Sequence, residues 1–184
     1  WMYHLDNNQV SVGFVVNLDY ENPYLSPYEE FQRFKLHPAI KGYFKNGKRV
    51  SYGARAINEG GLQSVPKLVF PGGCLIGCSA GFVNVPRIKG THNAMKTGML
   101  AAEATFKQLL LNTESPDPLL SDYDLSWKKS PVWKDLWKVR NVKPSLKWGL
   151  LLGNIHAGIN MWLNDLGLGF LIPYTLKHSK PDHM

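Results

Sequence analysis

The feature that most constrains this chain is residues 67–111, where a short apolar run passes through a turn of small residues into a helical pattern. The run at 74–76, Cys-Leu-Ile, predicts a strand. The turn at 77–81, Gly-Cys-Ser-Ala-Gly, leaves room for another backbone or a ligand to come close. The order strand, glycine turn and helix predicts an α/β element with a ligand-facing loop.

The helical pattern begins at Thr91 and carries small residues at intervals of three and four, which predicts a face for close packing. Gly90 comes directly before it, so the first N–H groups of the helix are expected to point at whatever lies beyond the turn. An electron-rich group is expected there. The predicted small-residue face consists of Ala94, Gly98, Ala101, Ala102 and Thr105.

Three segments of this stretch and its surroundings carry a resemblance to a known family. They are Asn-Glu-Gly-Gly at 58–61, Gly-Cys-Ser-Ala-Gly-Phe-Val-Asn-Val-Pro at 77–86 and Lys-Gly-Thr-His at 89–92. The glycine turn and helix resemble the second flavin-contacting element of flavoproteins with two dinucleotide-binding motifs. The literal sequence closely resembles the electron transfer flavoprotein–ubiquinone oxidoreductases over nearly the whole chain. Cys78 departs from the broad flavoprotein pattern, where an aspartate is usual, but Cys-Ser is typical of this family.

The resemblance implies an activity, cofactors and a location. In this family, electrons from reduced electron transfer flavoprotein pass through a 4Fe–4S cluster and FAD to ubiquinone in the membrane. The implied partners are electron transfer flavoprotein, ubiquinone and an anionic membrane surface, without nucleic acid. The implied location is the matrix side of the mitochondrial inner membrane, as a peripheral protein, with a bacterial cytoplasmic membrane as the alternative.

The resemblance also implies which residues meet the flavin. Thr91 is expected to touch the ring, because a hydroxyl and an N–H at a helix start can both donate to the N1 and C2-carbonyl side. Gly90 is expected to let the backbone approach the ring. No catalytic residue and no metal ligand is assigned. The predicted cofactor-binding residues are Gly77, Cys78, Ser79, Gly90, Thr91, His92 and Asn93.

The expected fold is mixed α/β: part of a two-dinucleotide-binding-motif FAD fold, with an antiparallel-sheet quinone-binding domain, incomplete at both ends. Residues 1–66 are predicted to belong to the quinone domain. Residues 67–111 are predicted to be the FAD-contacting strand, loop and helix. Residues 112–184 are predicted to form a basic, tryptophan-rich segment at the membrane surface and the quinone domain.

We expect the 184 residues to be an internal piece of a longer protein, since they begin with Trp1. No Gly-x-Gly-x-x-Gly that would hold the FAD pyrophosphate is present in the sequence, and two cysteines cannot supply four cluster ligands. Cys74 and Cys78 would lie roughly 13 Å apart on an extended strand, too far for a disulfide. They are predicted to be small buried thiols, and the isolated chain is predicted to be inactive.

The amino-terminal third predicts strands and one helix. Residues 10–18 form a valine-rich run with Gly13 inside it, which indicates a buried strand with a bulge. Ser26 and Pro27 predict a helix start, followed by two acids where the helix dipole favours them. Residues 48–56 predict another strand. A polar break with two prolines is expected at 112–118.

Six of the seven net positive charges lie between Trp127 and Trp148, where seven basic residues face the single acid Asp135. Ser130 and Pro131 predict a short basic helix there. This segment admits three interpretations: a solvated globular face, a nucleic-acid surface or an interfacial membrane element. Nucleic acid is the weakest, because no binding motif is present.

A second helix is predicted at 148–164, with bulky residues on one face and small or amide residues opposite. From its first to its last residue the helix would rise roughly 24 Å, less than the hydrocarbon core of a bilayer. Tryptophans at both ends of the apolar face favour a helix lying on an anionic membrane surface. The predicted membrane and quinone residues are Trp148, Leu151, Leu152, Ile155, Ile159, Trp162 and Leu163.

Two other classes stay open from the residues alone. One is another FAD-dependent reductase or monooxygenase of the same fold, acting on a lipid-like substrate. The other is a non-catalytic membrane-binding module. A hydrolase is not supported, because Ser79 lacks the Gly-x-Ser-x-Gly context of a nucleophile elbow.

Overall fold

The computed structural model describes residues 1–18, 20–111 and 120–177. Its internal contacts divide the chain into two compact units, Trp1–Ala54 and Arg55–Met184. Each unit combines helices with a small antiparallel sheet, in agreement with the mixed class predicted from the sequence. The break expected at 112–118 lies outside the described residues.

Unit 1 begins with a hairpin. Strand β1 (Met2–Leu5) pairs antiparallel with β2 (Gln9–Val12), and the turn between them places Asn7 and Asn8 at φ values of 58° and 56°. Asparagine tolerates this left-handed conformation, which tight hairpin turns require. The predicted strand 10–18 is therefore wrong beyond Val12, because the pairing with β1 ends there and residues 13–17 have no regular structure.

Three helical segments follow in unit 1: α1 (Pro27–Leu36), α2 (Pro38–Lys41) and the 3-10 turn η1 (Gly42–Phe44). The predicted start of α1 is confirmed, since Ser26 Oγ accepts a hydrogen bond from the N–H of Glu29 at 3.4 Å. The predicted strand 48–56 is wrong. Among the described residues no strand pairs with this segment, which runs without regular structure.

Unit 2 builds the predicted turn and helix, whereas the predicted strand at 74–76 is confirmed only at Cys74 and is wrong at residues 75 and 76. The two-residue strands β3 (Val69–Phe70) and β4 (Gly73–Cys74) form a hairpin, and the 3-10 turn η3 (Gly77–Ala80) leads toward the long helix α3 (Thr91–Leu110). A short 3-10 turn, η2 (Leu62–Ser64), precedes them.

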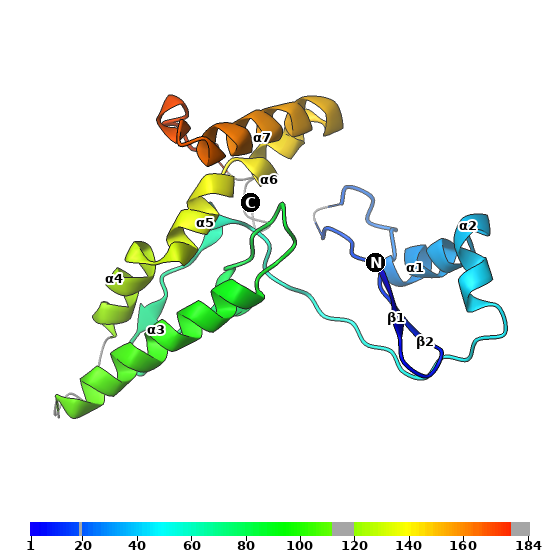
Figure 1. Cartoon of the computed structure of the whole chain (residues 1–184), viewed down its shortest axis with the longest axis horizontal. Helices are drawn as coiled ribbons and strands as arrows, with labels where there is room; N and C mark the ends of the chain where they lie inside the picture. The colour runs from blue at the N-terminus through cyan, green and yellow to red at the C-terminus, as the bar shows by residue number, and fades with distance from the viewer. Residues whose placement is uncertain (19, 112–119, 178–184) are drawn as a thin grey trace. The chain divides into compact units, whose positions relative to one another are not determined.

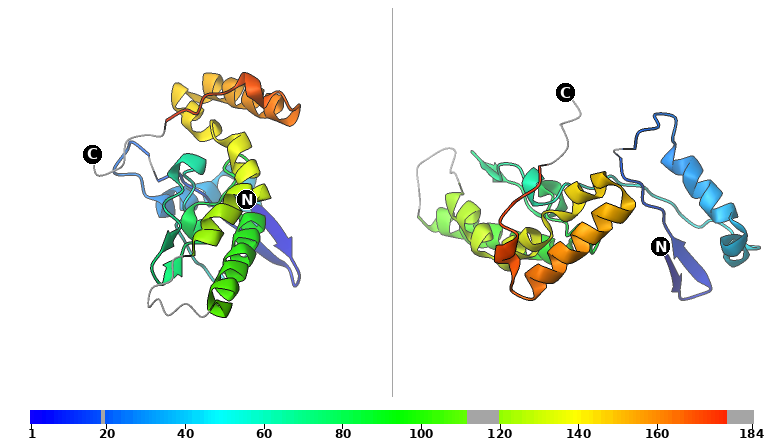
Figure 2. Two further views of the ribbon diagram at one scale, coloured as in Figure 1. Left: turned by 90° about the vertical axis from the view of Figure 1, so that its left-hand side faces the viewer. Right: turned by 90° about the horizontal axis from the view of Figure 1, so that it is seen from above.

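The second half of unit 2 is helical. Figure 1 shows α3 running beside α4 (Ser121–Lys129), with α5 (Pro131–Val139) continuing from α4 and α7 (Leu150–Asp165) lying across the far end of α5. Ser130 Oγ accepts from the N–H of Val132 and so caps α5, as predicted. The short segments α6 (Val142–Ser145) and η4 (Leu146–Trp148) connect α5 to α7, and η5 (Gly169–Leu171) follows α7. Figure 2 shows the same crossing of α7 from two further sides.

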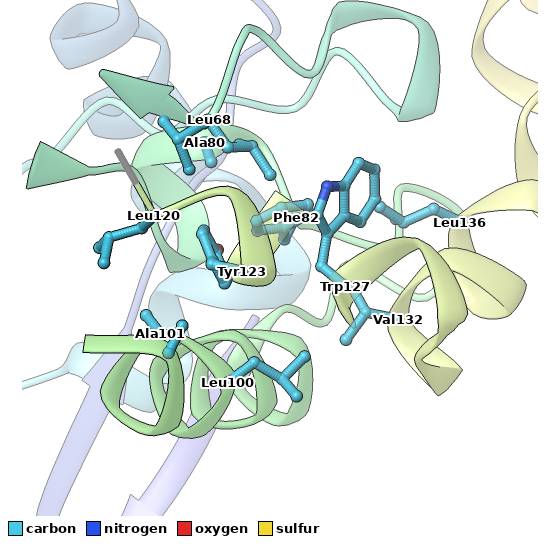
Figure 3. Packing of buried hydrophobic residues seen from close by; sticks show 12 residues of the cluster. Leu68, Ala80, Phe82, Leu100, Ala101, Leu120, Tyr123, Trp127, Val132 and Leu136 are labelled. Atoms are coloured by element: carbon cyan, nitrogen blue, oxygen red, sulfur yellow. The ribbon is translucent and has the colours of Figure 1, made fainter. Parts of the chain in front are cut away.

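The core of unit 2 lies between the η3 loop, α3, α4 and α5, as Figure 3 shows. Phe82 packs against Trp127 with ring centroids 5.2 Å apart, and Trp127 packs in turn against Trp133. The Tyr123 hydroxyl donates to the carbonyl of Leu75 at 2.9 Å, which ties α4 to the exit of the β3–β4 hairpin. The segment from β4 through η3 is therefore held by α4 at both ends: Tyr123 bonds to Leu75 before η3, and Trp127 packs against Phe82 after it.

The buried face of α3 differs from the predicted one. Of the five small residues expected there, only Ala101 is buried, whereas Ala102 and Thr105 are exposed. The reason is that a different stripe of α3 faces the protein. This stripe includes two polar side chains with hydrogen-bond partners there: Asn93, which donates to Asp135, and Thr97, which accepts from Gly77. The buried residues are Asn93, Thr97, Leu100, Ala101 and Ala104.

Candidate functional site

The η3 turn is held against the first turns of α3 by one buried side chain. The Thr97 hydroxyl accepts a hydrogen bond from the N–H of Gly77 at 3.1 Å and donates to the carbonyl of Asn93 at 2.8 Å. Gly77 has a φ of 60°, and a Cβ there would stand 3.2 Å from the Cβ of Ala94. The glycine is therefore required by backbone conformation and by contact with α3.

The N-terminus of α3 has free donors. Gly90 occupies the N-cap and has no side chain to cap the helix, and Ala94 is the first residue whose N–H bonds back, to the carbonyl of Gly90 at 2.8 Å. Within the part of the chain that the structure describes, the N–H groups of Thr91, His92 and Asn93 donate to no protein acceptor. Uncapped N–H groups at a helix start favour an electron-rich or anionic group.

The side chains around this helix start are unequally accessible. Thr91, His92, Cys78 and Ser79 are exposed, whereas Gly77 is buried and Gly90 is half-buried. The Asn58 side chain joins this loop by donating to the carbonyl of Ser79 at 3.0 Å. The exposed hydroxyls of Thr91 and Ser79 and the open N–H groups form a donor set that fits an electron-rich cofactor.

One expectation for these residues needs correction. Cys78 is an exposed thiol rather than a buried one, because η3 turns it away from the core, while Cys74 is half-buried and burial raises its pKa. Gly90 also lies close to the protein: a Cβ there would stand 3.1 Å from Cγ2 of Val83. The Asn93 side chain points into the protein and is 2% exposed.

Asp135 is a functional candidate that the sequence did not single out. Its Oδ1 accepts from Nδ2 of Asn84 at 2.9 Å, and its Oδ2 accepts from Nδ2 of Asn93 at 3.2 Å and lies 3.2 Å from Nε2 of His92. Burial raises the pKa of Asp135, but hydrogen bonds from Asn84, Asn93 and His92 outweigh it, so the pKa lies below its usual value. The signal in the sequence was its place as the one acid in a basic segment.

The helix predicted at 148–164 is confirmed as α7 from Leu150, but Trp148 lies in η4, separated from α7 by Gly149 at a φ of 92°. The two faces of α7 differ as the sequence predicted. Its small side packs against α6 and η4: a Cβ on Gly153 would stand 2.6 Å from the carbonyl oxygen of Ser145, and Ala157 and Asn160 are buried. The bulky side is exposed. Six of the seven residues predicted for the membrane are exposed, at 74% for Leu151, 62% for Leu152 and 65% for Trp162, with Trp148, Ile155 and Ile159 between 51% and 53% and Leu163 half-buried.

The basic segment presents less free charge than its composition indicates. Arg140 is 2% exposed and donates to the carbonyls of Trp137, Ile172 and Tyr174 and to Thr175 Oγ1. Lys128 pairs with Asp124 at 2.7 Å and Lys138 with Asp165 at 3.1 Å. Within the basic segment, the exposed lysines that form no ion pair with a described residue are Lys129, Lys134 and Lys147.

Neither a metal centre nor a spanning helix is found in residues 1–18, 20–111 and 120–177. No group of three histidine, cysteine or acidic side chains is arranged to hold a metal ion. None of the helices is both long enough and apolar enough to cross a bilayer.

Comparison with known proteins gives one consistent result. A family model described as the ubiquinone-binding domain of electron transfer flavoprotein–ubiquinone oxidoreductase matches residues 1–57, which include all of unit 1. The whole chain is 52% identical to the mitochondrial electron transfer flavoprotein–ubiquinone oxidoreductase of Dictyostelium discoideum. It is 54% identical to the protein of the same name from Rattus norvegicus over 99% of the chain, and 49% identical to that of Oryza sativa. The chain spans 30% to 31% of the length of these relatives.

Proposed function

The chain belongs to the electron transfer flavoprotein–ubiquinone oxidoreductase family, and we propose that the protein that contains it oxidises reduced electron transfer flavoprotein and reduces ubiquinone. We further propose that it does so from the matrix side of the mitochondrial inner membrane, as the word mitochondrial in the relatives' names suggests. The observation that carries the proposal in this chain is the open N-terminus of α3 beside the η3 turn.

FAD is the cofactor proposed for this element. Thr91 and His92 would face the ring from the first turn of α3, and the exposed polar residues of η3, Cys78 and Ser79, would lie along the chain that joins ring and phosphates. When bound, FAD supplies reversible electron uptake. The protein groups supply donors: the first-turn N–H groups and the Thr91 hydroxyl favour negative charge on the ring and therefore its reduced form.

The fold around these donors keeps them in place without the cofactor. Thr97 fixes Gly77 against α3, and Asn58 fixes the carbonyl of Ser79. Donors that are already held in position need not move when negative charge develops on a bound group. Such preorganised donors are the main means by which a protein stabilises a charged state. Residues 67–111 are therefore proposed to be the FAD-contacting part of the chain.

The described residues do not fit the 4Fe–4S cluster. Cys74 lies in β4 and Cys78 in η3, and a cluster requires four thiolate ligands. If the protein holds a cluster, its ligands come from outside these 184 residues.

The remaining parts are proposed to serve the quinone and the membrane. Residues 1–66, of which the ubiquinone-binding model matches 1–57, are proposed to contribute to the quinone domain. Residues 112–184 are proposed to bring α7 to an anionic membrane surface, with the bulky face of α7 in the lipid. Exposed apolar side chains favour this, together with Lys147 at the start of the helix.

The test uses the full-length protein, purified and reconstituted with vesicles that contain ubiquinone. We expect a flavin absorbance spectrum, bleaching of that spectrum by reduced electron transfer flavoprotein, and recovery when ubiquinone is present. A full-length protein that folds without flavin would contradict the proposal. A flavin that is reduced by a pyridine nucleotide but not by electron transfer flavoprotein would favour another enzyme of the same fold.

A further inference from the structure

Asp135 joins three segments that are far apart in the sequence. It lies on α5, and its carboxylate oxygens contact Asn84 in the loop after η3, and His92 and Asn93 in the first turn of α3, at 2.9 to 3.2 Å. The Asp135 side chain is 20% exposed, so water competes little with these contacts. One carboxylate therefore holds both the loop that enters α3 and the first turn of α3.

The two asparagine partners of Asp135 are buried, so water cannot take the place of the carboxylate. Asn84 is 1% exposed and Asn93 is 2% exposed, and the side-chain amide of each donates to the carboxylate. Asn84 also pairs through its backbone with Lys89, in both directions, which closes the 84–89 turn directly before Gly90. Because buried amide donors need acceptors, Asp135 fixes the position of this turn and of the helix start together.

The charge of Asp135 acts on the same helix end. The first turn of α3 carries the positive end of the helix dipole, and a carboxylate beside it offsets part of that positive potential. Two side chains face the carboxylate from the same turn and helix start. They are the His92 imidazole, at 3.2 Å, and the Arg87 guanidinium, whose Nη1 lies 3.9 Å from Oδ1 and whose side chain is 64% exposed. A negative charge near a ring that becomes anionic on reduction disfavours the reduction.

We propose that Asp135 is a positioning residue for the flavin: it holds the first turn of α3 at the ring, and its negative charge lowers the flavin reduction potential. This inference rests on the proposed function, which brings FAD to that helix end. It goes beyond it by assigning a role to a residue of the basic helix α5, which does not itself meet the cofactor.

The principal test compares Asp135→Asn with Asp124→Asn in the full-length flavinated protein. Asn has the size of Asp but no charge, while Asp124 is a half-buried acid of α4 whose partners, Trp127 and Lys128, lie in its own helix. Redox titration should show a more positive flavin midpoint potential in Asp135→Asn and a smaller change in Asp124→Asn. Asp135→Glu should return the potential toward that of the wild type, because it restores the charge.

Hydrogen exchange measures the positioning role separately. Amides of residues 84–97 should exchange faster in Asp135→Asn than in the wild type, and at the wild-type rate in Asp124→Asn. If the amides of Asp135→Asn exchange faster but its flavin midpoint potential equals that of the wild type, Asp135 has only a structural role and the proposal is overturned. Equal potential shifts in Asp135→Asn and Asp124→Asn would overturn it as well.

Two surface variants keep the test decisive if Asp135→Asn does not fold. Arg87→Gln removes the exposed cation beside Asp135, whereas Lys89→Gln removes an exposed cation from the same turn without a contact to the carboxylate. The flavin potential should fall further in Arg87→Gln than in Lys89→Gln; equal shifts would contradict the proposal. If the wild-type protein holds no flavin, the proposed function fails. If it holds flavin but the midpoint potential does not change in these variants, only the role of Asp135 is rejected.

Discussion

At the scale of single residues, buried polar side chains decide where the backbone of this chain lies. Thr97 in α3 holds the N–H of Gly77, twenty residues earlier, and Gln63 donates to the carbonyls of Arg140 and Leu176. The Thr97 bond gives the buried N–H of Gly77 an acceptor, and the Gln63 bonds tie η2 to the end of α5 and to residue 176. None of them follows from a hydrophobic pattern, which is why the sequence predicted the strand, turn and helix but not the contacts between them.

Thr97→Val should weaken the joint between η3 and α3. Valine has the shape of threonine but leaves the N–H of Gly77 without an acceptor, which costs about 1 to 3 kcal/mol. The melting temperature of the full-length protein should fall. Thr105→Val is the matched control, because the exposed Thr105 hydroxyl donates only to Ala101 of its own helix. Equal melting temperatures for the two variants would contradict the assigned role of Thr97.

Thr91→Val should keep FAD bound and make its reduction harder. The variant removes one side-chain donor from the first turn of α3 while the N–H groups remain. A lost hydrogen bond to a charged group is worth about 1.5 to 3 kcal/mol, or roughly 30 to 60 mV for a two-electron reduction. The flavin midpoint potential measures this. An unchanged potential would mean that Thr91 does not touch the ring.

Asp135 should also leave a signature in the pH dependence of stability. Its pKa in the folded protein lies below the ordinary value of 3.8, so its contribution to stability is present above about pH 4 and is lost as the pH falls through the folded pKa. The difference in melting temperature between wild type and Asp135→Asn should therefore be largest near neutral pH and shrink below pH 4. A difference that stays constant down to pH 3 would show that charge is not involved.

At the scale of elements, helices with a local start signal were predictable, whereas α4 and the short strands were not. The starts of α1 and α5 carry a serine cap followed by proline, which is a local signal, and both are confirmed. The predicted strand at 48–56 and most of the one at 10–18 are wrong, because a strand exists only where a partner strand lies beside it. The sequence shows strand-forming side chains but not that partner.

The orientation of α7 was predictable for a similar local reason. Bulky and small residues alternate with the helical period, so the small side could be expected to face the protein. The buried stripe of α3 was not predictable, because its size pattern suggested one face while the hydrogen bonds of Asn93 and Thr97 select another. Size periodicity fails where buried polar groups determine the contact.

Gly153 tests the packing of α7. A Cβ on Gly153 would stand 2.6 Å from the carbonyl oxygen of Ser145, so Gly153→Ala should force α7 away from α6 and cost about 1 to 3 kcal/mol. Gly158 lies in the same helix with nothing within 4 Å of such a Cβ, so Gly158→Ala should stabilise the helix by about 0.5 to 1 kcal/mol. Thermal melting of the two full-length variants should move in opposite directions, and a shared direction would contradict this packing.

At the scale of the whole molecule, hydrogen-bond donors, positive charges and exposed apolar side chains lie on different helices. The donors proposed for the flavin lie at the start of α3, and the exposed apolar side chains of the proposed membrane face lie mainly on α7. The unpaired lysines of the basic segment, Lys129, Lys134 and Lys147, lie at the end of α4, on α5 and in η4. Asp135 on α5 contacts the start of α3, and α5 also packs against α7. The helix α5 therefore connects the proposed flavin element to the proposed membrane element.

The membrane proposal is tested by replacing Leu151, Ile155 and Ile159 with serine in the full-length protein. All three are exposed on the bulky face of α7, so the variant should fold and retain flavin. The face contributes several kcal/mol to membrane binding at about 25 cal/mol per Å², and the variant should therefore leave vesicles and the detergent phase. Its activity with ubiquinone in a bilayer should fall much more than its activity with a short, soluble quinone.

The matched control for this variant replaces Leu109, Leu110 and Leu125, exposed leucines of α3 and α4, with serine. These residues lie outside the proposed membrane face, so the control should stay bound to vesicles and keep its activity with bilayer ubiquinone. If the α7 variant unfolds or loses FAD, then another part of the protein covers that face and it is not in the membrane. If both variants leave the vesicles alike, membrane binding depends on total hydrophobicity rather than on α7. Only selective loss in the α7 variant, with the flavin spectrum intact, is consistent with an interfacial helix, because a core helix cannot lose three large apolar side chains without lowering the stability of the fold.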